Sequence, residues 1–100
     1  MQTEQVMLKN GEATGVVIPA GPVSIVAVIA AEGMVGCGAF DVEALGRFGY
    51  AAAAARAVSG PSITTVADLL AGEIVRVNGT ARSRGVREGM SGKEALDLLS

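Results

Sequence analysis

The only cysteine of the chain, Cys37, lies between two glycines in the stretch GMVGCGAFD at residues 33–41. A thiol becomes a strong nucleophile when a helix N-terminus or a cation lowers its pKa, and a helix is expected to begin just after Asp41. Free cysteine also packs as a small apolar side chain, and flanking glycines are typical of a crowded strand. Packing is the favoured interpretation of Cys37, and catalysis as a nucleophile or redox group is the alternative.

Further positions could activate or bind a small anionic ligand. Asp41 is a candidate general base, although a role as helix N-cap is sufficient to explain it. Arg56 follows five alanines, so its guanidinium is expected either to reach solvent or to hold a carboxylate or anion. Ser91 and Gly92 stand at the expected start of a helix, where free N–H groups attract anions. The spacing there is not that of a P-loop, and ordinary capping is the alternative.

The chain contains no histidine. This excludes Ser-His-Asp and Cys-His nucleophile arrangements and the imidazole general base. One thiol without any imidazole also excludes a Cys/His metal site within one chain, and no acids are clustered for magnesium or calcium. We therefore expect no metal and no cofactor.

Composition bounds the class of protein. One hundred residues, half of them apolar but only 3% aromatic, indicate a single domain with an aliphatic core. The formal charge of −2, with scattered arginines, gives no basic patch for nucleic acid. The aliphatic run at 23–31 is too short to span a bilayer, and without a signal peptide or disulfide framework we expect a cytoplasmic protein. Excess apolar surface favours self-association.

The N-terminal half predicts strands. Asn10 and Gly11 form the expected hairpin turn between two short strands, since both residues tolerate positive φ. The run 23–31 lacks polar alternation, which predicts a strand buried on both faces. Glu32 and Gly33 then predict a turn into an antiparallel strand that begins at Met34.

The C-terminal half predicts three short helices and further strand. The first helix follows Asp41, with Gly49 as its candidate stop. Thr65 and Asp68 have capping-box spacing before a second helix that ends at Gly72. A strand is expected over 73–77, with a stop at Asn78 and Gly79, and the polar stretch 80–89 is expected to be turns. Ser91 and Glu94 have capping-box spacing before the C-terminal helix.

Residues 51–58 are ambiguous. Five alanines favour a helix by propensity, whereas the ending RAVS before Gly60 suits a strand, so both structures stay open. Together the elements predict an α+β domain with a mostly antiparallel or mixed sheet and three short helices. An N-terminal β region of about residues 4–40 is expected to oligomerise, and an α/β part follows over about 41–100.

Three phrases taken in order, GCGAFDV, ARAVSG…TTVADLLAG and VREGMSGKEALDLL, resemble the YunC-like family of small uncharacterised bacterial and archaeal proteins. The resemblance covers nearly the whole chain, and Cys37, Asp41, Arg56 and Ser91 match its motifs, whereas the alanine run departs from them. This family is a domain of unknown function whose N-terminal β region is described as mediating tetramer formation. The resemblance therefore implies a homotetramer, favours a strand over the alanines, and transfers no activity.

Two functions remain in competition. The first is a small homo-oligomeric structural or binding module without a catalytic role, which binds neither nucleic acid nor membrane. The second is an enzyme or redox sensor that uses Cys37, with Arg56 and the Ser91 helix end fixing a small anion in a pocket between subunits. A regulatory partner of a larger enzyme is a third idea that leaves no mark in one sequence.

Overall fold

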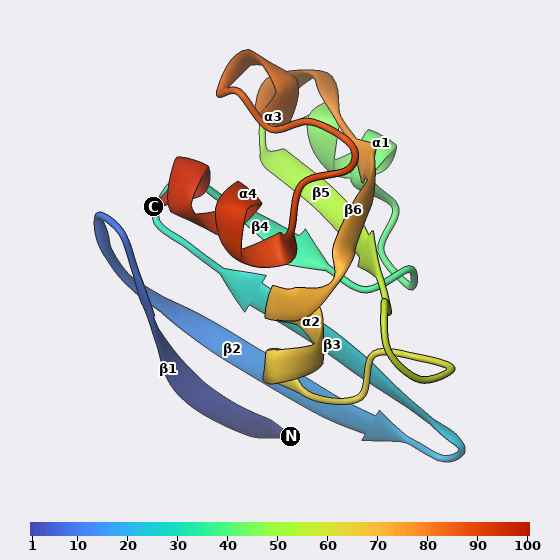
Figure 1. Ribbon diagram of the computed structural model, residues 1–100. Coiled ribbons are helices and arrows are strands. Elements are labelled where there is room, and N and C mark those ends of the chain that lie inside the picture. The colour runs from blue at the N-terminus through green and yellow to red at the C-terminus, as the bar shows by residue number, and fades with distance from the viewer.

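The computed structural model describes residues 1–100 and contains six strands and four helices (Figure 1). The strands are β1 (Gln2–Leu8), β2 (Gly11–Ala20), β3 (Val23–Ile29), β4 (Gly33–Gly36), β5 (Ala51–Arg56) and β6 (Glu73–Val77). The helices are α1 (Val42–Gly46), α2 (Val66–Ala71), α3 (Gly79–Ser83) and α4 (Gly92–Leu99). None of the helices has the length and apolar content needed to cross a membrane. The expected α+β class is confirmed.

The strands lie in the sheet in chain order, from β1 at one edge to β6 at the other. Every neighbouring pair is antiparallel except β4 and β5, which run parallel. Antiparallel neighbours can be joined by tight turns, but a parallel pair needs a crossover connection. The segment that contains α1 makes this crossover.

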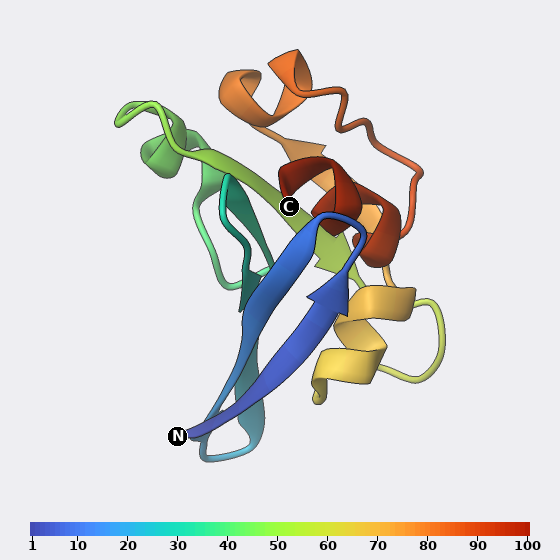
Figure 2. The same cartoon turned by 90° about the vertical axis from the view of Figure 1, so that its left-hand side faces the viewer.

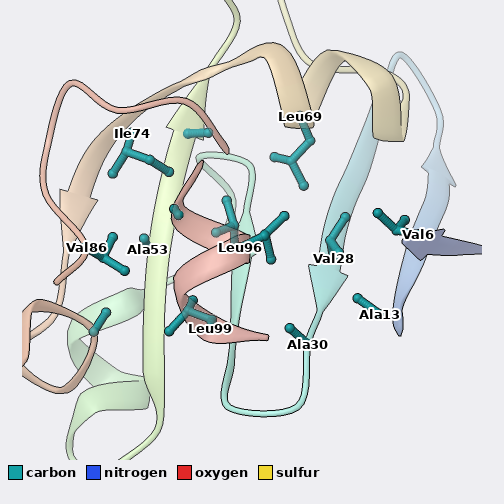
Figure 3. Close-up of a cluster of buried hydrophobic side chains, with 14 of the residues drawn as sticks. Val6, Ala13, Val28, Ala30, Ala53, Leu69, Ile74, Val86, Leu96 and Leu99 are labelled. Carbon is teal, nitrogen blue, oxygen red and sulfur yellow. The ribbon is translucent and has the colours of Figure 1, made fainter. Parts of the chain in front are cut away.

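One face of the sheet carries the larger core (Figure 3). Leu69 of α2 and Leu96 and Leu99 of α4 are fully buried there, against inward side chains of the strands such as Val28 and Ala53. This arrangement follows from the capped, amphipathic sequences of α2 and α4, whose leucines recur at helical spacing. Because most of the buried apolar side chains lie in this layer, it contributes most of the hydrophobic free energy of folding.

The opposite face carries a smaller core under α1. Val42 of α1 packs with Met34, Ala52 and Ala54 of the central strands. Figure 2 shows α1, in green, on the other side of the sheet from α2 and α4. The helix covers only this part of the face, and apart from Ala27, which belongs to the smaller core, the outward residues of β1–β3 are left without a covering element.

Hydrogen bonds from two turns tie the N-terminal strands to the end of α4. The backbone N–H groups of Lys9 and Asn10 donate to Asp97 Oδ1 at 2.9 Å and to Ser100 Oγ at 3.2 Å. The N–H of Glu32 donates to the carbonyl oxygen of Leu99 at 2.8 Å. The β1–β2 hairpin is thus held over the C-terminus, which explains how residues from the two ends of the chain share one core.

Helix caps are the sequence features that the structure confirms best. Asp41 accepts from the N–H of Ala44, and both capping boxes, at Thr65 and at Ser91, are complete. Such caps satisfy N–H groups that would otherwise lack partners, so their side-chain chemistry is readable without tertiary context. Gly72 ends α2, also as predicted.

Four details differ from the sequence predictions. There are four helices, because Asn78 caps α3 in a stretch that we expected to be turns. The first hairpin turn is Lys9-Asn10 rather than Asn10-Gly11, since Leu8 pairs with Gly11 and a slip by one residue would turn Val6 and Leu8 out of the core.

Helix α1 ends at Gly46, before Gly49, which takes a φ of +72° in the following turn. In β3, burial on both faces holds only for Val26–Val28, and Ile29 is exposed because no element covers its side of the sheet.

The ambiguous alanine run is strand β5. Ala51–Ala55 are at most 2% exposed, because this strand lies between β4 and β6 and has a packed layer on each face. Alanine propensity for helix is a weak preference that burial in a sheet easily overrides.

Candidate functional site

The carboxyl ends of the parallel strands β4 and β5 meet at one edge of the sheet, and in Figure 1 their arrowheads point the same way. From β4 the chain leaves towards α1 on one face, and from β5 it leaves towards α2 on the other. In open, mostly parallel α/β sheets, a crevice forms where neighbouring strands send their connections to opposite faces, and the single parallel pair β4–β5 has the same local arrangement. This edge is therefore the place to look for a site.

A cavity of about 400 Å³ lies at this edge. It exists because β4 is short. The ladder between β3 and β4 covers only Ala27–Ile29 and is extended by the bond from Cys37 N–H to Val26 O. The first residues of β3 and the last residues of β5 consequently have no strand between them. The wall consists of Val23, Ser24, Ile25, Cys37, Gly38, Ala39, Ala55, Arg56, Ala57, Pro61, Ser62, Ile63 and Val75.

The cysteine lies in the wall of this cavity. Cys37 is the first residue after β4 and is only 8% exposed, in the same apolar cluster as Ala55 and Ile63. Its thiol makes no hydrogen bond within the chain. The side chain is packed, as the favoured interpretation expects, and it also borders a space that a small molecule could occupy, which leaves the catalytic alternative as a prediction.

The arginine lies at the rim. Arg56 is the last residue of β5, and its Nη2 donates to Glu73 Oε1 at 2.6 Å across the β5–β6 ladder. The Arg56 side chain is 64% exposed, so this pair contributes little to the free energy of unfolding. Of the two expectations for Arg56, solvent or a carboxylate partner, the structure shows both.

A β-bulge shapes the outer wall. The register between β5 and β6 shifts between Ala54 and Ala55, so that Ala54 faces Arg76 while Ala55 faces Ile74, and Val75 is the extra residue. Bulges of this kind redirect a side chain and end regular pairing. Val75 is one of the cavity residues as a result.

Three of the predicted site residues lie elsewhere. Asp41 is outside the cavity wall and accepts the Ala44 N–H at 3.1 Å as the N-cap of α1. Ser91 caps α4 and borders a separate hollow with Glu94. Gly92 is buried against the backbone of Leu69, where a Cβ would clash with the carbonyl oxygen. The structure thus brings Cys37 and Arg56 together and separates them from Asp41, Ser91 and Gly92.

Nothing in the sequence indicated that Arg76 of β6 holds the loop between Cys37 and Phe40. Arg76 of β6 donates from Nη2 to the carbonyl oxygens of Gly38, at 3.2 Å, and Phe40, at 3.4 Å. The peptide bond between Gly38 and Ala39 is trans, so its N–H points opposite to its carbonyl oxygen. Since that oxygen faces Arg76, the N–H of Ala39 points away from Arg76. The alternation of EIVRV placed Arg76 on one face of a strand, but only the parallel β4–β5 pairing reveals what that face meets.

No group of three or more cysteine and acidic side chains is arranged to hold a metal ion. The polar groups of the cavity wall are instead Arg56, the hydroxyls of Ser24 and Ser62, and the backbone of the loop that follows Cys37. Such a mostly apolar wall with a few polar groups is the usual character of a small-molecule site.

The fold and cavity define a small α+β domain with one hollow at the end of its parallel strand pair. Residues 36–99 match the family DUF1805, described as a domain of unknown function, and the chain belongs to this family. The match starts at the cavity loop and leaves β1–β3 outside it. No curated protein matches the chain.

A solved structure shares the fold. It is a protein of unknown function, TA1206 from Thermoplasma acidophilum, with a TM-score of 0.87 over 99% of this chain and 92% of that one. The two sequences are 17% identical, so the likeness concerns the fold alone. Neither comparison assigns an activity.

Proposed function

We propose that this chain is a homo-oligomeric structural and binding module of the YunC-like type, whose subunits associate through the outer face of β1–β3. The observation that carries the proposal is an exposed apolar sheet face. Met7, Ile18, Val23 and Ile29 each expose between 38% and 66% of their surface. The β1–β2 and β2–β3 registers put all four on one side of the sheet, opposite the larger core.

Charge on this face favours a second copy of the chain as the occupant. Among the outward positions of β1–β3, only Glu12 is charged. A two-fold interface brings each surface against itself, and a face with one charge at its end pairs with its copy without strong like-charge repulsion. Two such faces pack at about 10 Å, and the free edge of β1 offers a further contact.

The oligomer that the proposal includes is a tetramer, as expected from the resemblance to the YunC-like family. A buried free thiol at Cys37 fits the reducing cytoplasm, where thiols stay unpaired, and we place the protein there. The N-terminal β region supplies the interface, and the family-matched part supplies the cavity wall except for Val23, Ser24 and Ile25 of β3.

Sedimentation velocity tests the proposal. Four chains of 10.0 kDa give a tetramer of about 40 kDa, and an Ile29→Glu variant is expected to sediment as smaller species. Burying a carboxylate against apolar partners is costly, whereas Ile29 faces solvent within one subunit, so the variant should still fold.

The matched control is Val58→Glu. Val58 is 60% exposed against 47% for Ile29, but it lies in the loop after β5, and its variant should sediment like the parent chain. A folded monomer for the parent chain at micromolar concentration, or equal dissociation by both variants, would contradict the proposal.

A further inference from the structure

We propose that the cavity at the ends of β4 and β5 binds a small monocarboxylate with an apolar body, with Arg56 and the N–H groups of Gly38 and Ala39 holding the carboxylate. The inference goes beyond self-association, and Val23 is the one residue shared by the proposed interface and the cavity wall. Its first support is place and size, since a cavity of about 400 Å³ is within the usual range for small ligands and lies at the strand ends where such ligands bind.

The wall determines the body of the ligand. Val23, Ile25, Ala55, Ile63 and Val75 give an aliphatic lining without an aromatic ring. A flexible alkyl group fits such a lining, because nothing in it would stack on a planar ring. Burial of the alkyl group would supply affinity through the hydrophobic effect.

The polar groups determine the head of the ligand. The backbone N–H groups of Gly38 and Ala39 have no acceptor within the chain. Glu73 occupies only Nη2 of Arg56, and a guanidinium has five donors in a fork that matches a carboxylate. These donors lie beside one cavity and are free to bind an anion.

Charge sets the limit at one negative charge. Arg56 is the only charged residue in the cavity wall, and Glu73 already neutralises it. A dianion such as phosphate would place two negative charges beside that carboxylate, where repulsion between like charges is several-fold stronger than in water. A monocarboxylate avoids most of this cost.

The experiment is a titration of the ¹⁵N-labelled full chain with sodium hexanoate, followed through the backbone amide signals. Saturable shifts are expected at Gly38 and Ala39. Hexylamine and 1-hexanol, which share the alkyl body, are expected to produce much weaker shifts at these amides. If either binds as tightly as hexanoate, or if hexanoate leaves both amides unmoved, the proposal is wrong.

Three variants test the assignment of the headgroup site. Arg56→Gln should weaken hexanoate binding about tenfold or more, as expected for the loss of a charge-assisted pair, whereas Arg47→Gln, outside the cavity, should not. Glu73→Gln should tighten binding, since it removes the nearby negative charge. Unchanged affinity in Arg56→Gln would overturn the assignment of the headgroup.

Gly38→Val tests the cavity itself. A Cβ at Gly38 meets no atom within 4 Å and its φ is not positive, so the variant should fold, and because Gly38 lines the cavity the added side chain is expected to weaken binding. Gly11→Val is the control, because Gly11 is equally unobstructed but lies in the first hairpin. The amide spectra report whether each variant is folded, and full affinity in folded Gly38→Val would show that the ligand binds elsewhere.

Discussion

At the scale of single residues, Asn78 joins more elements than any other polar side chain. Its Oδ1 accepts the N–H groups of Ala52 and Ala81, and its Nδ2 donates to the carbonyl oxygens of Val42 and Tyr50. The residue is 1% exposed. One side-chain amide therefore connects β5, α1 and α3. Its oxygen accepts two hydrogen bonds and its nitrogen donates two, so no polar atom of this buried side chain lacks a partner.

Replacing Asn78 by alanine is expected to lower the free energy of unfolding by about 3 kcal/mol. The change removes the N-cap of α3 and leaves buried backbone groups without partners. Urea denaturation followed by circular dichroism measures the effect.

The matched control is Asn10→Ala, at an exposed turn, which should change stability by no more than about 0.5 kcal/mol. Equal effects of the two substitutions would mean that the Asn78 network is unimportant for stability.

Cys37 shows how far a residue type can be interpreted alone. The sequence alone shows its thiol chemistry and its glycine neighbours, and these favour packing. Its position beside a cavity could not be predicted, because Ala55 and Ile63 come from segments that are distant in the sequence, and the segment of Ala55 stayed open between helix and strand.

At the scale of elements, the close packing around β5 explains why this central strand is made of alanine. The strand lies between two covered faces, and Gly33 of β4 comes so close that a Cβ there would lie 2.5 Å from the carbonyl oxygen of Ala51. Small side chains let α1 approach from one face and α4 from the other. A larger side chain in this layer has no space to occupy.

Ala53→Leu is expected to destabilise the fold by about 1–3 kcal/mol through overpacking, because Ala53 is fully buried in the larger core. Thermal unfolding by calorimetry measures the effect as a lower Tm. Ala71→Leu, at the exposed end of α2, is the control and should leave Tm nearly unchanged. A stable Ala53→Leu protein would show unfilled space in this layer.

At the scale of the whole molecule, three carboxylates, one exposed and two half-buried, couple stability to pH. Hydrogen bonds from Thr64 lower the pKa of Asp68, the Arg82 guanidinium lowers the pKa of Glu88, and the Lys93 ammonium lowers the pKa of Asp97. The folded chain therefore binds protons less readily than the unfolded chain. As pH falls through the ordinary range near 4 and below, the unfolded state takes up more protons and stability is lost.

The urea midpoint is accordingly expected to be lower at pH 3 than at pH 6. Asp68→Asn should reduce the difference between the two pH values, because the substitution removes one of the three coupled groups. Glu12→Gln, whose glutamate makes no hydrogen bond or ion pair, should leave the difference unchanged. A midpoint independent of pH over this range would contradict the assignment.

The sequence by itself determined what depends on neighbours along the chain. Caps at Asp41, Thr65 and Ser91, strand alternation in β6 and the aliphatic character of the core all depend on residues a few positions apart. The absence of histidine limited the chemistry in the same way. These features could be predicted because their physical causes are local.

The tertiary structure decided what depends on pairing between distant segments. The parallel register of Gly33–Gly36 with Ala51–Ala54 turned the alanine run into a strand and brought Cys37 and Arg56 to one cavity. It also left Asp41 and Ser91 apart, in capping roles. The free-energy difference between helix and strand for an alanine is smaller than the free energy that burial in the sheet gives to β5. Only the assembled layers therefore determine that residues 51–56 form a strand and where the cavity lies.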